Sequence, residues 1–263
     1  MDLDLAGKRV LVTGASKGIG LATVRMFLAE GASVTAVARR STPELDATAA
    51  TFFAADLSTP GGPRRTIENV LAADPRLDVL VNNVGGGTIP DGMLTDPLGG
   101  DDEDWDRAFA LNLHAAVRLS RAALPALTAA RGAIVNVGSS SSLLPHTAPL
   151  SYAVAKAALN AFSRGLAEKV GESGVRVNVV TPGATHTPLV TGEDGVTAKL
   201  AAAVGVDHAA VLEEFPRQNG LVTGQLIDPS EIARVIVLLS SPTLPSAVGS
   251  NWALHAGSLK MPA

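Results

Sequence analysis

The chain of 263 residues contains no cysteine and few aromatic side chains, which make up 3% of it. Without cysteine there can be no disulfide bond, no thiol nucleophile and no thiolate ligand for a metal. So few aromatics leave little surface on which bases or sugars could stack. The five histidines show no metal-ligand spacing, so we expect no metal site either.

Charge is limited as well. Charged residues are 17% of the chain, its net charge is −4, and no basic stripe is present, so nucleic acid is not an expected partner. No apolar stretch approaches the roughly 18 residues that a membrane span needs. The segment Met1–Leu5 is acidic rather than basic, which is unlike a secretory signal. We therefore expect a cytoplasmic protein without a membrane partner.

Apolar runs typical of strands buried on both faces alternate with helical stretches from one end of the chain to the other, and hydrophobic residues make up 46%. This alternation predicts an α/β fold with a doubly wound, Rossmann-like parallel sheet of about seven strands and helices on both faces. No linker divides the chain, so residues 1–263 form one expected domain. The expected strands are Arg9–Thr13, Ser33–Ala38, Thr51–Ala55, Val79–Asn82, Ala133–Val137, Val175–Val180 and Asn251–Leu254.

The helices expected between these strands differ in length. A brief one begins at Pro43, and two stretches rich in loops are expected at Gly85–Gly100 and Leu189–Gly224, the second with short helical pieces such as Ala198–Val204. The longer expected helices are Leu21–Glu30, Asp101–Thr128 and Leu150–Val170.

Tyr152 and Lys156 lie four residues apart in a helical stretch, after Ser139. Side chains at i and i+4 share one face of a helix, so the phenol and the ammonium would point the same way. A phenol titrates near pH ~10, and a nearby positive charge lowers its pKa. Together with a hydroxyl donor, this pair can move a proton to or from a carbonyl oxygen. An exposed tyrosine lying on a lysine stem is the structural alternative.

Three glycines, Gly14, Gly18 and Gly20, join the first expected strand to the first expected helix. Glycine lets the backbone turn tightly and approach a pyrophosphate, and free amides at the helix N-terminus then face the phosphate oxygens. The spacing Gly-x-x-x-Gly-x-Gly differs from the commoner Gly-x-Gly-x-x-Gly. A purely structural turn remains the alternative.

These motifs, in this order, resemble the short-chain dehydrogenase/reductase family over nearly the whole chain. Val84 stands where the family usually has alanine, and His255 stands where it often has aspartate. The matching segments are Thr13-Gly14-x-x-x-Gly18-x-Gly20, Asp56-Leu57, Asn82-Asn83-Val84-Gly85, Asn112, Ser139, Tyr152 with Lys156, and Pro182-Gly183-x-x-x-Thr187.

The resemblance implies a role for each catalytic residue. Tyr152 would be the acid or base, and Lys156 would lower its pKa and contact the cofactor ribose. Ser139 would donate to the substrate oxygen, and Asn112 would hold a water that links Lys156 to solvent. The implied cofactor-binding residues are Gly14, Ser16, Lys17, Gly18, Ile19, Gly20, Arg39, Arg40, Asp56, Leu57, Asn83, Val84, Gly85, Tyr152, Lys156, Pro182, Gly183, Thr185 and Thr187.

The end of the second expected strand predicts NADP(H) rather than NAD(H) as the cofactor. An acid at this place binds the adenosine ribose hydroxyls and repels a 2′-phosphate, whereas arginine attracts that phosphate. This chain has Ala38 there, followed by Arg39 and Arg40, and Lys17 lies in the glycine turn. Arginine grips phosphate through two parallel hydrogen bonds, and lysine adds a point charge. The alternative is that both arginines are solvated loop charges.

The leading hypothesis is an oxidoreductase that transfers a hydride between NADP(H) and a carbonyl or secondary alcohol. Alternatives are a 3-oxoacyl thioester reductase of the same family and a non-catalytic dinucleotide-binding sensor. The resemblance further implies a homotetramer, and it implies that residues 189–224 cover the substrate, although a surface insertion without that role is possible. His186, near the expected nicotinamide, is interpreted as a bystander.

Overall fold

The computed structural model describes residues 2–86, 96 and 98–260. Seven parallel strands form one sheet in the order β3-β2-β1-β4-β5-β6-β7. The order reverses beside β1, which is the arrangement of a doubly wound sheet and confirms the predicted fold. The strands are β1 Arg9–Thr13, β2 Ser33–Ala38, β3 Thr51–Ala54, β4 Val79–Asn82, β5 Ala133–Val137, β6 Arg176–Pro182 and β7 Asn251–Leu254.

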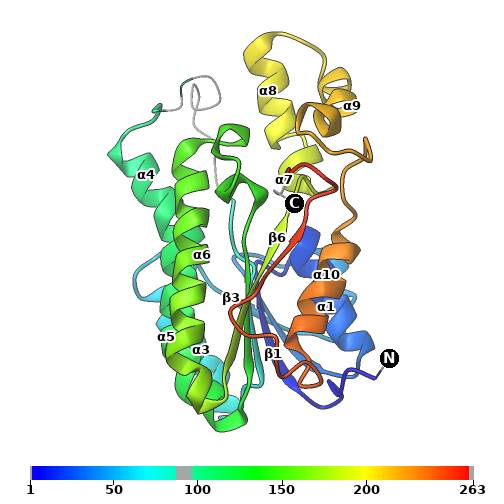
Figure 1. Cartoon of the computed structure of the whole chain (residues 1–263). Helices are drawn as coiled ribbons and strands as arrows, with labels where there is room; N and C mark the ends of the chain where they lie inside the picture. The colour runs from blue at the N-terminus through cyan, green and yellow to red at the C-terminus, as the bar shows by residue number, and fades with distance from the viewer. Residues whose placement is uncertain (1, 87–95, 97, 261–263) are drawn as a thin grey trace.

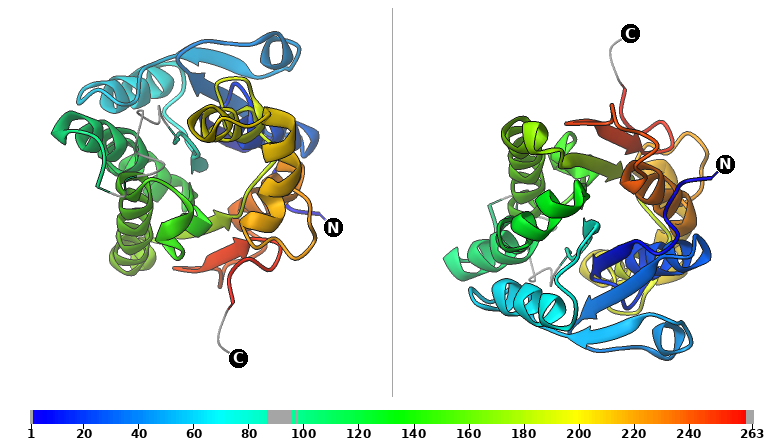
Figure 2. Two further views of the ribbon diagram at one scale, coloured as in Figure 1. Left: turned by 90° about the horizontal axis from the view of Figure 1, so that it is seen from above. Right: turned by 90° about the horizontal axis from the view of Figure 1, so that it is seen from below.

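Helices cover both faces of the sheet: α1 and α10 lie on one side, and α3, α5 and α6 on the other (Figures 1 and 2). The helices are α1 Gly18–Ala29, α2 Pro43–Asp46, α3 Gly62–Ala73, α4 Asp102–Phe109, α5 Ala115–Ala130, α6 Leu150–Val170, α7 Pro188–Thr191, α8 Val196–Val204, α9 His208–Gln218 and α10 Pro229–Ser240, with a π-helical turn at Ala110–His114 and 3₁₀ turns at Ser140–Ser142, Pro145–Thr147 and Gly171–Ser173.

The strand sequences explain the two layers of core. Successive side chains of a strand point to opposite faces, so a continuous apolar run feeds both layers. In β1, Val10 and Val12 pack with Phe27 of α1 and Ile236 of α10. Leu11, between the two valines, packs on the opposite face with residues of α3, α5 and α6.

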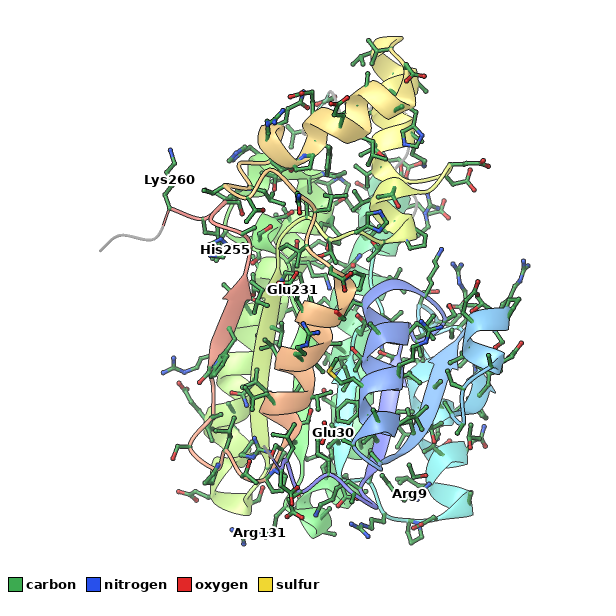
Figure 3. All side chains as sticks on the ribbon, turned by 90° about the vertical axis from the view of Figure 1, so that its right-hand side faces the viewer. Arg9, Glu30, Arg131, Glu231, His255 and Lys260 are labelled. Carbon is green, nitrogen blue, oxygen red and sulfur yellow. The ribbon has the colours of Figure 1, made fainter. Side chains whose placement is uncertain are left out.

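The carboxyl ends of the strands lie under the segment α7–α9, which forms the top of the molecule in Figure 1. Figure 3 shows the two ends of the sheet: Arg9, at the start of β1, lies at the bottom, and His255, after β7, lies near α7–α9. In open α/β sheets, ligands bind beyond the carboxyl ends of the strands. The fold therefore places α7–α9 over the expected ligand crevice.

Several element boundaries differ from the prediction. The helix expected at Asp101–Thr128 is interrupted by the π-helical turn. Strand β6 begins and ends later than predicted, and β3 ends one residue early. The loop predicted at Gly85–Gly100 falls mostly outside the described residues. Among the described helices, none alone is apolar and long enough to cross a membrane, although the bent pair Pro188–Val204 and His208–Gln218 passes that test by length and composition.

One buried arginine joins the sheet to α10. Arg176, at the start of β6, is 8% exposed, and its guanidinium donates to the carbonyls of Leu239 at 2.8 Å and Ser240 at 3.0 Å. These carbonyls belong to the last turn of α10, where a positive charge is electrostatically favoured. Burial lowers the pKa of Arg176, and the described residues offer it no ion pair. Helix-end carbonyls therefore compensate this buried charge.

We expect Arg176→Met to lower the free energy of unfolding by about 2 kcal/mol, because buried carbonyls lose charged donors. The matched control is Arg164→Met, which removes an exposed arginine paired with Glu168 one turn away and should cost less than about 0.5 kcal/mol. Urea unfolding at one protein concentration measures both. Equal effects of the two substitutions would show that the bonds of Arg176 do not stabilise the fold.

Candidate active site

The glycine turn between β1 and α1 is too crowded for larger residues. Gly14 has φ +62°, and a Cβ there would lie 2.9 Å from the Cα of Val84. At Gly20 a Cβ would lie 2.2 Å from the carbonyl oxygen of Gly14. No side chain caps α1, whose N-cap residue is Lys17. The first-turn amides of α1 are therefore available to an anion.

Asn83, directly after β4, holds this turn in place. Its Nδ2 donates to the carbonyls of Thr13 at 3.0 Å and Gly14 at 3.1 Å. Its own amide donates to Thr13 Oγ1 at 3.1 Å. Asn83 was predicted as a cofactor-binding residue, and in the structure its side chain organises the turn that would receive the phosphates.

The segment after β2 lies against the same turn. Ala15 N donates to the carbonyl of Val37 at 3.2 Å, and Thr42 Oγ1 donates to the carbonyl of Ser16 at 2.9 Å. Thr42 is also the N-cap of α2. Sequence reasoning missed its contact with the turn, although a threonine before Pro43 is a recognisable cap.

Three cations gather around this contact. Lys17, Arg39 and Arg40 are exposed, and they form no ion pair with the described residues. Hydrogen bonds from Ser58 chiefly lower the pKa of Asp56, with a smaller contribution from the charge of Arg39. Asp56 is therefore an exposed carboxylate on the same side of the crevice as Arg39.

Some predicted cofactor residues are largely occupied by packing. Leu57 is 3% exposed and belongs to the core under α3 and α5. Ile19 packs against the core on the α1 side, and Val84 against the core on the other side. The side chain of Leu57 is thus committed to the core, which leaves its backbone as the part that can face a ligand, while Ile19 is only partly buried.

Lys156 is buried beside the end of β5. It is 3% exposed, and its Nζ donates to the carbonyl of Val137 at 2.8 Å. Burial lowers the pKa of Lys156 to about 8, because a low-dielectric surrounding disfavours the ammonium. A Cβ at Gly85 would lie 3.0 Å from this Nζ, so glycine at this position makes room for the ammonium.

The phenol of Tyr152 lies next to Lys156 and Ser139, as the sequence predicted. The Lys156 Nζ is 5.9 Å from the centroid of the Tyr152 ring. Burial raises the pKa of Tyr152, and a hydrogen bond from Ser139 opposes that rise. Burial thus acts against ionisation of the phenol, and the lowering of its pKa that the resemblance implies for Lys156 stays a prediction.

Asn112 occupies the π-helical turn between α4 and α5 and is 1% exposed. Its Oδ1 accepts from the amide of Gly86 at 2.8 Å, and its Nδ2 donates to the carbonyls of Gly86 and Ala108, both at 2.9 Å. Both amide protons are thus used by the backbone. The side chain fixes the loop after β4, and the water that it was expected to hold stays a prediction.

The segment after β6 closes the other side of the crevice. Gly183 N donates to the carbonyl of Leu254 at 2.7 Å, and Thr185 Oγ1 donates to the carbonyl of Gly183 at 2.9 Å. A Cβ at Gly18 would lie 2.9 Å from Cγ2 of Thr187. Pro182 is the last residue of β6. Of the predicted residues of this segment, Thr187 therefore lies against the glycine turn, and Pro182, Gly183 and Thr185 form the strand end and loop that lead to it.

These contacts bring the predicted segments together beyond the carboxyl ends of the strands, where ligands bind in open α/β sheets. Leu189 of α7 lies over Gly86, where a Cβ would be 3.2 Å from Cδ2 of the leucine. His186 is exposed. Hydrogen bonds from Ser230 chiefly lower the pKa of Asp228, with smaller contributions from Arg234 and His186. The uncapped α1 N-terminus, the crowded glycines and three cations without ion pairs among the described residues fit a phosphate-bearing dinucleotide. Ser139, Tyr152 and Lys156 fit proton transfer at a carbonyl oxygen.

Comparisons with known proteins agree with this geometry. A family model for short chain dehydrogenase matches residues 8–195. An uncharacterized oxidoreductase, YvrD, of Bacillus subtilis is 33% identical, with 99% of each chain covered. The 3-oxoacyl-[acyl-carrier-protein] reductase FabG of Vibrio harveyi is 31% identical, with 97% of this chain and 98% of the relative covered.

A solved structure is also similar over its whole length. The L-sorbose reductase of Gluconobacter frateurii, complexed with NADPH and L-sorbose, shares 32% identity at a TM-score of 0.88, and all of both chains is covered. The fold, the site and these similarities show that the chain belongs to the short-chain dehydrogenase/reductase family. It is an oxidoreductase of that family, which acts on CH–OH and C=O groups with a nicotinamide dinucleotide.

Proposed function

We propose that the protein reduces a carbonyl, or oxidises the corresponding secondary alcohol, with NADP(H) as the preferred coenzyme. The observation that carries this proposal is the convergence of Ser139, Tyr152 and the buried Lys156 beside the glycine turn. When bound, the nicotinamide supplies or accepts the hydride, and the protein supplies position and electrostatic field.

The side chains divide the proton chemistry between them. A raised pKa keeps the Tyr152 phenol protonated at neutral pH, so it can donate its proton to the substrate oxygen during reduction. Ser139 donates a hydrogen bond to the same oxygen, where negative charge develops. The ammonium of Lys156, with a pKa of about 8, remains largely charged at neutral pH and stabilises the phenolate that is left behind.

We further propose a small, uncharged, hydroxylated ketone as the substrate class. The segment Leu189–Gly224 carries five carboxylates, but Lys199 and Arg217 are its only lysine and arginine. Such a cover is unfavourable for a substrate that bears phosphates. L-sorbose, the ligand in the similar reductase structure, is uncharged and belongs to the proposed class.

The alternative of a 3-oxoacyl thioester reductase draws support from the relatives of that activity. A panel of L-sorbose, simple aliphatic ketones and an acetoacetyl thioester distinguishes the two. A non-catalytic dinucleotide sensor is the third candidate, and coenzyme turnover with any ketone would exclude it. All four catalytic residues are present, which supports an enzyme.

A homotetramer and a cytoplasmic location are also part of the proposal. A groove of about 460 Å³ between α3 and α5 is lined by Arg64, Arg118 and Arg121, among others. The Nη1 of Arg118 is buried there without a hydrogen-bond partner in the described residues. We propose that another copy covers this groove, with the family resemblance as the main support. A molecular mass of 26.7 kDa, that of the monomer, measured in solution by light scattering would contradict a tetramer.

We expect Tyr152→Phe to lower kcat for ketone reduction by about 10²-fold or more, because the ring stays and only the proton donor is lost. NADPH binding, followed by fluorescence titration, should remain within a few-fold of the parent, and circular dichroism should be unchanged. If Tyr152→Phe retained kcat within a few-fold of the parent, Tyr152 would not be the proton donor.

We expect kcat/KM to favour NADPH over NADH by roughly thirtyfold to several hundredfold, since contacts of charge with phosphate contribute about 2–4 kcal/mol. The double variant Ala38→Asp, Arg39→Leu should reverse the preference, because an acid binds the ribose hydroxyls of NAD(H) and repels the 2′-phosphate.

Lys169→Leu serves as the control for this coenzyme experiment. It removes a positive charge from the exposed last turn of α6, far from the glycine turn, and should leave the coenzyme ratio unchanged. A parent that uses NADH as well as NADPH would show that Arg39 does not reach the coenzyme.

A further inference from the structure

One face of helix α6 contacts the end of β5 and the segment that follows it, through three successive helical turns. Tyr152 meets Ser139, Lys156 bonds to the carbonyl of Val137, and Asn160 donates from Nδ2 to Ser142 Oγ at 2.9 Å. Residues at i, i+4 and i+8 lie on one side of a helix. The first two contacts belong to the catalytic residues, whereas the third has no role in the chemistry above.

The bond from Asn160 continues to the catalytic serine. Ser142 Oγ donates its single proton to the carbonyl oxygen of Ser139 at 2.6 Å, and that carbonyl also accepts from the amide of Ser142 at 3.0 Å. Because Asn160 donates to the hydroxyl oxygen, the hydroxyl proton is directed toward Ser139. Chains of hydrogen bonds of this kind strengthen one another.

The position of the Ser139 hydroxyl depends on this turn. Ser139 is the N-cap of the 3₁₀ turn Ser140–Ser142, and its Oγ accepts from the amide of Ser141 at 3.2 Å. This bond uses one acceptor position of Oγ and leaves the hydroxyl proton available for an acceptor on the side of Tyr152. A shift of the turn relative to α6 would therefore change the distance between the Ser139 hydroxyl and the Tyr152 phenol.

We propose that Asn160 is a positioning residue for the reaction, acting through Ser142 to hold Ser139 at its working distance from Tyr152. This inference rests on the proposed function, because Ser139 must donate to the substrate oxygen. The side-chain amide of Asn160 is enclosed. Its Oδ1 is buried, and a Cβ at Gly138 would lie 3.2 Å from that oxygen. The amide is therefore confined between Gly138 and Ser142.

The test uses kcat and KM for NADPH and for the best ketone of the panel. Asn160→Ala should lower kcat about tenfold, since small misplacements of a group that acts in the transition state are costly. The KM for NADPH should stay within about twofold, because the bond to the substrate oxygen strengthens only in the transition state. Asn160→Asp, which keeps the shape but accepts from Ser142 instead of donating, should resemble Asn160→Ala.

A double-mutant cycle tests the route through Ser142. Ser142→Ala should lower kcat by a similar factor, and the double variant Asn160→Ala, Ser142→Ala should fall no further than either single variant. Effects that multiply would overturn the proposed coupling.

The matched control is Ser163→Ala on the same face of α6. Ser163 Oγ accepts from Asn136 Nδ2 at 2.8 Å, away from the catalytic turn. Its loss should lower the melting temperature but leave kcat near the parent value. If Asn160→Ala changed kcat no more than Ser163→Ala does, while Tyr152→Phe was inactive, the positioning role would be refuted and the proposed function would stand. An active Tyr152→Phe variant would instead refute the proposed function.

Discussion

The buried ammonium of Lys156 is the interaction on which the rest of the centre depends. Removing such a charge from water costs several kcal/mol unless it is compensated, and the carbonyl of Val137 provides one compensating bond. That bond fixes α6 against the end of β5 and so sets where Tyr152 stands. Glycine at position 85 fits this arrangement, because a Cβ there would lie 3.0 Å from both Nζ of Lys156 and Oδ1 of Asn112, which is tight.

The cofactor side of the crevice is held together by backbone contacts rather than by charges. Asn83 bonds to the carbonyls of Thr13 and Gly14, and Thr42 bonds to that of Ser16. These neutral bonds position the glycine turn and leave Lys17, Arg39 and Arg40 without ion pairs among the described residues. A turn held by these bonds, with three exposed cations on it and on the neighbouring segment, is suited to a ligand with several phosphates.

Much of this arrangement could be predicted from the sequence, because buried parallel strands read as continuous apolar runs and their ends carry the functional residues. Five of the seven strands have the predicted bounds. The π-helical turn was not predicted, because the apolar pattern around Asn112 reads as one continuous helix, and the contact of Asn112 with Gly86 joins residues distant in the sequence. The raised pKa of Tyr152 depends on its burial, which the sequence does not show. The bounds of helix α9 are hard to predict because Pro216 lies within it. The bonds of Arg176 and Asn160 likewise join segments that only the fold brings together.

The central claim is that a buried Lys156 must be charged for the Tyr152 centre to work. Its most direct test is the pH dependence of kcat/KM for NADPH in ketone reduction, which reports groups of the free enzyme. Because burial lowers the pKa of Lys156 to about 8, the protonated form is lost as pH rises through that value, and kcat/KM should fall about tenfold for each further pH unit. A profile that stayed level from about pH 7 to about pH 10 would contradict the account.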